Sequence, residues 1–380
     1  MWGVRCGVPS SPGRVRAPLP RRHHLAACVA FAGVCRDTSP AHESALEGAL
    51  PPSIEQCVCR LHSCLPSMVN PMTSRERFLM TINHQRPDRI PTAWGARDEI
   101  NRAVVEWYGV DGLSAALDIM GVDRNGGAGI GIRHRGWEQK PKSAKPGDWP
   151  GGGRNFYWHD ERTFEDEWGI VQRVGRDEKY VEWISGPLVD AEDPDEYDFP
   201  TIDDLIEAPD LAERVQQQKD DGLFVAGGVM QPYKLCWTLR GMEQFLMDYL
   251  LNPGFVEKLY DTVYGLWTEI GTRLARAGIE MLSVGGDIAM HDRIIMGADT
   301  WRRFDKPRTA AMFSAIREIN PQMHFFIHSD GDLTEIMDDL IEIGFDVIDP
   351  IQPECMDPIE VKRRWGDRIT LHGCGSLQKV

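Results

Sequence analysis

The chain has 380 residues, 42% of them hydrophobic, and a formal net charge of −16. This length allows one large domain or two ordinary ones. The acidic balance makes nucleic acid or an anionic membrane surface an unfavourable main partner. No stretch approaches the roughly 20 apolar residues of a membrane-spanning helix, so we expect no membrane span.

Residues 1–71 differ from the rest in composition. They hold seven arginines, no lysine and six of the nine cysteines, and they lack hydrophobic periodicity. We therefore predict an unstructured extension over 1–71 and a folded domain over 72–380. With only Cys236, Cys355 and Cys374 left, the folded part has no disulfide framework, which indicates a reducing, cytoplasmic compartment.

Three interpretations of the extension remain open. Arg21-Arg22 ahead of the apolar Leu25–Val34 resembles a signal peptide. The spacing Cys57-x-Cys59-x2-His62-x-Cys64 offers zinc ligands, although in no standard pattern. The interpretation we prefer is a stretch translated upstream of a true start at Met68 or Met72, because globular patterning begins abruptly at Thr73.

The first half of the folded part mixes helices with a hairpin. Thr73 and Glu76 form a helix-capping pattern, and a short strand is expected at Trp94. Two helices follow, and the Gly- and Trp-rich stretch 121–160 is predicted to be an excursion from the core. Two alternating segments indicate a β-hairpin outside the main sheet. The helices are expected at 101–108 and 113–119, and the hairpin strands at 163–174 and 179–184.

The second half alternates buried strands with helices, which predicts a parallel sheet covered by helices. No Gly-rich phosphate loop follows the first strand, so a closed (β/α)8 barrel is favoured over a doubly wound sheet. We count about seven strands and expect a TIM-type barrel that lacks its last βα unit. The later strands are predicted at 223–228, 281–287, 325–330, 345–350 and 369–373, and a long helix at 253–277.

Polar residues follow these strands directly. His328 and Asp330 come after the apolar Phe325–Ile327, and Asp287 ends the strand before. Residues two apart in a strand leave the same face, and chemistry in parallel α/β barrels is placed at the carboxyl ends of strands. We predict Asp287, His328 and Asp330 as catalytic residues. The alternative for Asp287 is a cap of the next helix.

A metal is one interpretation of this cluster. His328, Asp330 and Glu354, with Cys355 and Cys374 in reserve, offer three zinc ligands and an open position, which is the catalytic arrangement. The alternative is a hydrogen-bonded His–Asp pair beside an organic substrate.

Further residues lie at or beyond strand ends and are candidates for substrate binding. Arg97 and Arg240 oppose the acidic rim of Asp287, Asp330, Asp332, Asp349 and Glu354. Trp94 and Trp237 offer an aromatic wall for a flat ligand, and Tyr233 follows a strand end. For each aromatic residue the alternative is packing. The full set is Trp94, Arg97, Tyr233, Arg240, Gln352 and His372.

Ordered motifs over roughly residues 72–378 resemble the uroporphyrinogen decarboxylase superfamily. The resemblance implies a distorted (β/α)8 barrel with its pocket at the carboxyl ends of the strands. The superfamily includes porphyrinogen decarboxylases and zinc-dependent corrinoid methyltransferases. The motifs are Arg75-Glu76-Arg77-Phe78, Pro87-Asp88-Arg89-Ile90-Pro91, Leu239-Arg240-Gly241-Met242-Glu243, Gly286-Asp287, Lys306-Pro307-Arg308, His328-Ser329-Asp330-Gly331, Pro350-Ile351-Gln352-Pro353-Glu354 and Gly366-Asp367-Arg368-Ile369-Thr370.

The sequence departs from both branches. The decarboxylases' Met-Arg-Gln-Ala-Gly-Arg-Tyr motif is replaced by Trp94-Gly-Ala-Arg97-Asp-Glu-Ile-Asn-Arg102, which keeps one arginine spacing. The methyltransferases' His-x-Cys becomes His328-x-Asp330, and the chain stops before the eighth strand, where a later cysteine ligand would lie. We expect a truncated or incomplete C-terminus.

Three functions follow from the resemblance and the residues. We favour metal-assisted methyl transfer linked to a corrinoid carried by a partner protein. Decarboxylation of a porphyrinogen or smaller carboxylic acid is the second, although an acidic mouth repels a polyanion. The third is an inactive barrel that serves as a binding partner. Zinc, a corrinoid-binding protein and a homodimer are the expected cofactor and partners.

Overall fold

The computed structural model describes residues 72–143, 156–176 and 180–376. The extension predicted over 1–71, with its Cys/His pattern and its basic and apolar stretches, lies outside the described residues.

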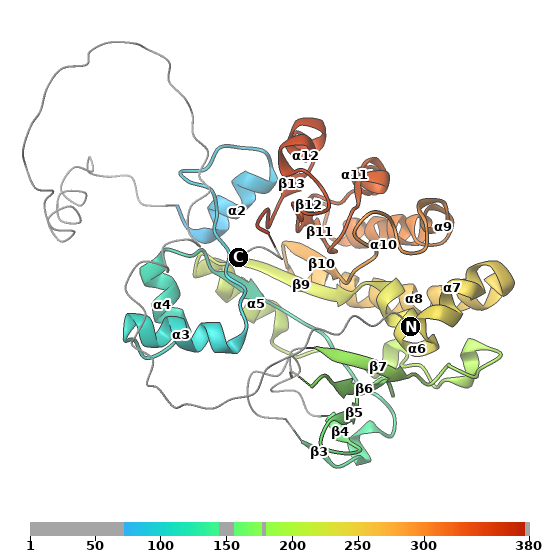
Figure 1. Ribbon diagram of the computed structural model, residues 1–380. Helices are drawn as coiled ribbons and strands as arrows, with labels where there is room; N and C mark the ends of the chain where they lie inside the picture. The colour runs from blue at the N-terminus through green and yellow to red at the C-terminus, as the bar shows by residue number, and fades with distance from the viewer. Residues whose placement is uncertain (1–71, 144–155, 177–179, 377–380) are drawn as a thin grey trace, which may run out of the picture. The chain divides into compact units, whose positions relative to one another are not determined.

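A six-stranded parallel sheet, in the order β1-β9-β10-β11-β12-β13, forms the centre of the folded part (Figure 1). Among the described residues no pairing joins β1 to β13, so the structure is α/β with a parallel sheet. The strands are β1 Asn125–Gly127, β9 Phe224–Met230, β10 Met281–Gly285, β11 His324–His328, β12 Val347–Asp349 and β13 Thr370–Leu371.

Helices connect consecutive strands and bury one face of the sheet. Phe313 of α10 stacks on Phe325 of β11 with ring centroids 3.6 Å apart, and Leu282 and Ile327 are almost fully buried in the same core. The helices are α5 Leu211–Asp220, α6 Pro232–Arg240, α7 Met242–Leu251, α8 Pro253–Ala277, α9 Ala298–Phe304, α10 Lys306–Ile319, α11 Met337–Ile343 (after the 3-10 turn η4 Thr334–Ile336) and α12 Pro358–Trp365.

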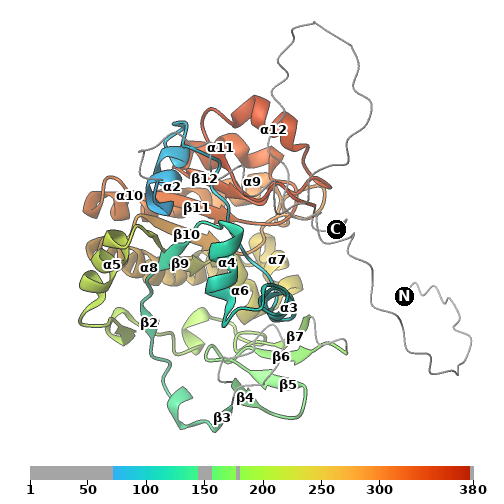
Figure 2. The same cartoon turned by 90° about the vertical axis from the view of Figure 1, so that its left-hand side faces the viewer.

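The opposite face of the sheet packs at its amino end against α2, Ser74–Ile82 (Figures 1 and 2). Phe78 and Ile82 of this helix cluster with Phe224, Phe326 and Val347 of three strands. The predicted capping box of Thr73 and Glu76 is confirmed at its start. Side chains alternate between faces along a strand, so the residue two beyond Phe326 lies on the α2 face, as does the residue two beyond Val347.

Ion pairs hold α2 in place. Arg77 is buried and pairs with Asp88 at 2.6 Å and with Asp123, which precedes β1. Arg89 reaches the same Asp123 carboxylate at 2.6 Å. Arg75 pairs with Glu280 at 2.7 Å, and Glu280 also accepts a hydrogen bond from the Val225 N–H of β9. A buried charge is tolerated only when paired in this way.

A five-stranded antiparallel sheet follows β1 in the chain. The hairpin predicted outside the main sheet is present as β6–β7, but segment 163–174 is itself two strands joined by a turn. Trp183 of β7 donates its Nε1–H to the Thr238 carbonyl of α6 at 2.8 Å. The strands are β3 Lys142–Ser143, β4 Phe156–Trp158, β5 Thr163–Glu165, β6 Val171–Val174 and β7 Val181–Ser185.

Two expectations for the first half are wrong. The segment at Trp94 is not a strand, and residues 125–127 of the supposed excursion form β1 of the main sheet. β1 reads Asn-Gly-Gly, which carries no apolar signal, and its pairing with β9 places it. The remaining elements are α3 Asp98–Tyr108, α4 Leu113–Met120, the pair β2 Gly131–Ile132 and β8 Leu205–Ile206, and the 3-10 turns η1 Trp137–Gln139, η2 Pro194–Glu196 and η3 Ile202–Asp204.

No helix in the described part of the chain is both long enough and apolar enough to cross a membrane.

The helical layer contains one buried carboxylate whose charge state should control stability. Asp305 is fully buried between α9 and α10, and the Tyr264 hydroxyl lies 3.4 Å from its Oδ1. Burial raises the pKa of Asp305 to about 7. The unfolded carboxyl ionises near pH 4, so the folded state holds the extra proton between about pH 4 and 7, and this contribution to stability is lost as the pH rises.

We therefore expect Asp305→Asn, which keeps an acceptor for Tyr264, to gain stability relative to the parent protein as the pH rises from 5 to 8. The slope should be at most ~1.4 kcal/mol per pH unit in the free energy of unfolding, measured with urea. The exposed Asp299→Asn is the matched control. A difference between Asp305→Asn and parent that does not change with pH would contradict the assignment.

Candidate metal centre

Three neighbouring strands end level with one another. In the sheet register Gly285 of β10 lies beside His328 of β11, and His328 lies beside Asp349 of β12. His328 and Asp349 are two residues beyond Phe326 and Val347, so both lie on the face that α2 covers at the other end. The carboxyl end of this face is therefore left for polar side chains, as expected for a parallel α/β protein.

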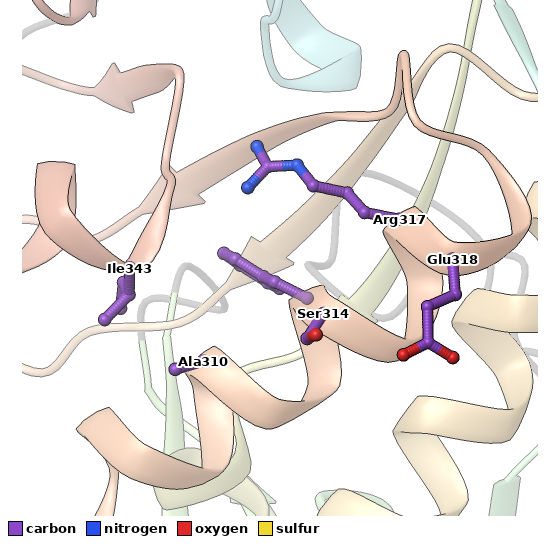
Figure 3. Close-up of a pocket in the computed structure, with 6 residues that line it drawn as sticks. Ala310, Ser314, Arg317, Glu318 and Ile343 are labelled. Carbon is purple, nitrogen blue, oxygen red and sulfur yellow. The ribbon is translucent and has the colours of Figure 1, made fainter.

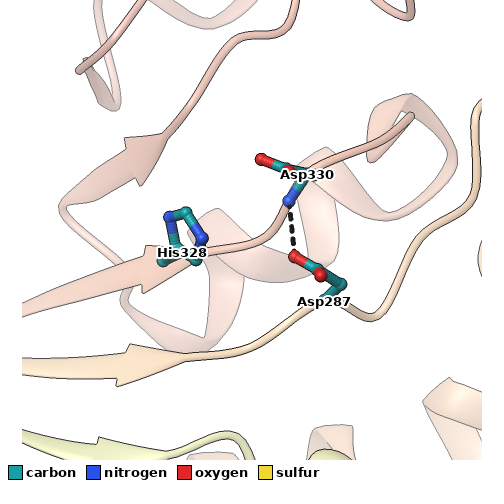
Figure 4. A group of neighbouring side chains, drawn as sticks. All are labelled: Asp287, His328 and Asp330. Carbon is teal, nitrogen blue, oxygen red and sulfur yellow. Dashed lines mark hydrogen bonds between the residues drawn. The ribbon is translucent and has the colours of Figure 1, made fainter. Parts of the chain in front are cut away.

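Asp287, His328 and Asp330 meet at this end (Figure 4). One ligand atom from each lies within 4.8 Å of those of the other two, and all three residues are half-buried. The backbone N–H of Asp330 donates to Asp287 Oδ1 at 3.0 Å, which ties the loop after β11 to the loop after β10. The structure thus brings together the three residues predicted to be catalytic.

The two carboxylates of this cluster repel each other. Burial and the nearby charge of Asp287 both raise the pKa of Asp330. A bound cation relieves this repulsion, and one imidazole with two carboxylates is a donor set that zinc accepts, with a fourth position open. The residues present therefore fit a divalent metal.

Asp349 orients His328. Its Oδ2 lies 2.7 Å from His328 Nδ1, and its Oδ1 lies 2.5 Å from Nδ1 of His372, which follows β13. Burial acts to raise the pKa of Asp349, but the hydrogen bonds from His328 and His372 outweigh it and hold this pKa at about 2. The same hydrogen bond raises the pKa of His328. With Nδ1 engaged, Nε2 is the nitrogen that His328 can offer to a metal.

A tight turn sets the position of Asp330. Gly331 has φ +97°, and a Cβ there would lie 2.4 Å from the Met290 carbonyl oxygen. Its N–H donates to Gln352 Oε1 at 3.1 Å. Gln352, predicted to bind substrate, is only 5% exposed, and its side chain supports this turn.

Two further residues predicted to bind substrate, Tyr233 and Arg240, have side chains in the protein interior. Tyr233 is fully buried and packs near Phe245. Arg240 is 7% exposed, pairs with Asp248 at 2.8 Å and donates to the carbonyls of Leu188 and Ala191. These partners compensate the cost of burying the Arg240 guanidinium.

Trp94 and Arg97 contact residues at the start of α3. Trp94 donates its Nε1–H to Asn101 Oδ1 at 2.8 Å, and Arg97 precedes α3 with its guanidinium 3.5 Å from Glu99. His372, the remaining residue predicted to bind substrate, lies at the strand ends, where its Nδ1 contacts Asp349.

The candidate metal group differs in its third member from the ligand set predicted from the sequence. In the described part of the chain the group that can hold a metal contains Asp287 and not Glu354. Glu354 accepts a hydrogen bond from Ser376, and Cys355 Sγ lies 3.4 Å from His291 Nδ1. Cys374 is exposed and is likewise outside the group. Loop residues such as Glu354 have no periodicity that would fix their direction.

Two surface hollows lie elsewhere. One of about 420 Å³ is lined by α10 and α11 residues including Phe313, Arg317 and Ile343 (Figure 3). These residues precede β11 and β12, so the hollow is at the amino ends of the strands. The other, about 540 Å³, lies along α3 and the start of α4. Neither hollow is lined by Asp287, His328, Asp330 or Asp349.

Comparison with known proteins identifies the family. Residues 172–375 match the family model described as uroporphyrinogen decarboxylase (URO-D), which covers more than half of the chain. The chain therefore belongs to the uroporphyrinogen decarboxylase family, as its motifs predicted.

Among solved structures, the chain is similar to a methyltransferase from Methanosarcina mazei. The TM-score is 0.51 at 14% sequence identity, and the match covers 79% of this chain and 82% of that one. At this identity the likeness concerns the fold alone. No curated protein sequence matches the chain.

The turn at Gly331 yields a stability prediction. Gly331→Ala should lower the free energy of unfolding by roughly 2 kcal/mol or more, because the added Cβ meets a backbone carbonyl at a positive φ. Gly265→Ala, at an exposed position inside α8 where a Cβ meets nothing, should instead raise it by about 0.5–1 kcal/mol. Equal effects in urea unfolding would show that the turn is not constrained.

Proposed function

We propose that this protein is a metal-dependent methyltransferase of the uroporphyrinogen decarboxylase family, which exchanges a methyl group with a corrinoid on a partner protein. The observation that carries this proposal is the group of Asp287, His328 and Asp330, backed by Asp349. In metal sites, the ligating histidine usually donates its other ring N–H to a carboxylate, which is the position of Asp349 behind His328.

Zinc is the metal we propose. The donors are one nitrogen and two carboxylate oxygens, a harder set than His with cysteines, and this favours an oxygen-bearing ligand at the open position. A bound zinc ion would act as a Lewis acid and lower the pKa of a coordinated hydroxyl or thiol.

The protein's own residues supply position and charge. Asp287 and Asp330 offset the charge of a divalent cation, and their N–H···O link keeps the two loops together. Asp349 holds His328 in one ring orientation. The Gly331 turn, tied to Gln352, aims Asp330 at the same point.

Decarboxylation is the second candidate, favoured by the description of the matching family model. In that function Asp287 would act as a general acid or stabilise a protonated pyrrole. A polycarboxylate needs arginines to grip it, and Arg240 is committed to Asp248 in the interior. The acidic row at the strand ends therefore supports methyl transfer better.

Further proposals concern the complete fold, the cellular compartment and the partners. We infer that the six parallel strands belong to a (β/α)8 barrel of the TIM type, as the family match and the structural neighbour support. We also propose that the chain works in a reducing compartment, with a corrinoid-binding protein and a second copy as partners. An inactive barrel that binds such a partner is the remaining alternative.

Metal analysis of the purified protein tests the function. We expect about one zinc per chain, lost in His328→Ala and reduced in Asp287→Asn and Asp330→Asn, with stoichiometry measured by mass spectrometry of the metal. Glu354→Gln is the matched control, since this carboxylate lies outside the group, and it should keep the metal.

Two outcomes would contradict the proposal. One is a protein that takes up no zinc on reconstitution and forms coproporphyrinogen from uroporphyrinogen, which supports decarboxylation. The other is loss of zinc in Glu354→Gln with retention in Asp287→Asn, which would restore Glu354 as the ligand.

A further inference from the structure

The carboxylate behind His328 serves a second imidazole. Asp349 is 17% exposed at its side chain, whereas His328 and His372 are 44% and 41% exposed. The two rings therefore open toward solvent while the carboxylate that joins them lies behind. His328 is at the end of β11 and His372 follows β13, so the pair spans three adjacent strands.

The register between β12 and β13 places Asp349 and His372 side by side. Ile348 of β12 lies beside Leu371 of β13, and the His372 N–H donates to the Ile348 carbonyl at 2.9 Å. Asp349 ends β12 and His372 comes directly after β13, so in this register both project from the α2 face. The His372 and Phe326 rings also meet in a T-shaped arrangement on the same face, with centroids 5.7 Å apart.

The backbone after His372 is shaped for a close approach to Asp349. Gly373 has φ +60°, and a Cβ at this position would lie 2.6 Å from Asp349 Oδ1. A residue with a side chain would therefore displace the carboxylate or the strand end. The glycine allows the His372–Asp349 contact to form.

The shared carboxylate dictates which ring nitrogen is exposed. An anionic carboxylate only accepts hydrogen bonds, so each neutral histidine must carry its proton on Nδ1. The nitrogens of an imidazole diverge, so both Nε2 atoms face away from Asp349 with a free electron pair. One carboxylate thereby sets the tautomer and the direction of two rings.

We propose that Asp349 is a positioning residue for two imidazoles of one site, with His328 directed to the metal and His372 standing beside it, open to the ligand that the metal holds. This inference rests on the proposed metal site for the role of His328. The tautomers of the two rings do not depend on a metal, so this part can be tested separately.

Asp349→Asn is the informative variant, because an amide offers one acceptor and one donor where the carboxylate offers two acceptors. Only one of the two histidines can then keep its Nδ1 proton, and the other must move its proton to Nε2. Long-range ¹H–¹⁵N spectra of the metal-free protein, labelled at histidine and recorded at pH 9, report both tautomers. We expect Nδ1–H on both rings in the parent and a change on at least one in Asp349→Asn.

Metal affinity gives the second readout. Asp349→Asn should bind Co²⁺ about 10–100-fold more weakly than the parent, as is typical when the partner of a ligating histidine is altered. His372→Asn should change the Co²⁺ affinity less than about threefold, because we place His372 beside the metal and not on it. Asp346→Asn is the matched control. Asp346 lies 3.7 Å from His324, at the amino ends of β12 and β11. Asp346→Asn should therefore leave both tautomers and the Co²⁺ affinity unchanged.

Chemical modification distinguishes the two rings. In the zinc-loaded parent, diethyl pyrocarbonate should modify His372 and spare His328, as measured by peptide mass spectrometry. The proposal is overturned if Asp349→Asn keeps the parent tautomers and affinity. It is also overturned if His372→Asn loses the metal as fully as His328→Ala, or if zinc protects both rings equally. A parent protein that binds no metal would defeat the proposed function, whereas the tautomer experiment would still decide the role of Asp349.

Discussion

The register of the parallel strands is the constraint on which the site depends. Gly285, His328 and Asp349 are neighbours across three strands, and the side chains of His328 and Asp349 project from one face. Parallel pairing brings together residues that are more than twenty positions apart in the chain. A shift of β12 by one residue would turn Asp349 to the helical core, where an unpaired carboxylate is costly. Val347 and Ile348 are both apolar and pack on opposite faces, so Asp349 is the residue of β12 that makes such a shift costly.

The face that carries the site is completed by α2 at its other end. The helix fills the amino end with Phe78 and Ile82, and its Arg77 is buried among Asp88 and Asp123. The family motifs at the start of the folded part therefore have a structural explanation, since they seat this helix. The motifs that follow β10 and β11 supply residues of the candidate metal centre, with Asp287 from one loop and Asp330 from the other.

Electrostatics at the strand ends explain why a metal suits the site. Asp287 and Asp330 are close enough to repel each other, and burial adds to the cost of the charge on Asp330. Asp349, by contrast, is stabilised as a carboxylate by two histidines. The site thus combines an anionic pair that needs a cation with a histidine held in the orientation that would bind one. An organic polyanion would find no such compensation here.

The sequence alone determined much of the architecture. Apolar runs and helical periodicity predicted strands β9 to β13, helix α8 and the cap of α2, because burial on both faces leaves a continuous apolar signal. Strand-end position was enough to predict Asp287, His328 and Asp330 as one cluster. The family followed from ordered motifs, and the family match confirmed it.

Tertiary structure decided what periodicity does not encode. β1 is Asn-Gly-Gly and becomes a strand only through its pairing with β9. Arg240 and Tyr233 follow a strand end in sequence but turn into the helical core, where one finds Asp248 and the other packs near Phe245. The choice of Asp287 over Glu354, and the sharing of Asp349 by two histidines, depend on loop direction and strand register. Both are set by contacts between distant segments, which no local pattern of residues contains.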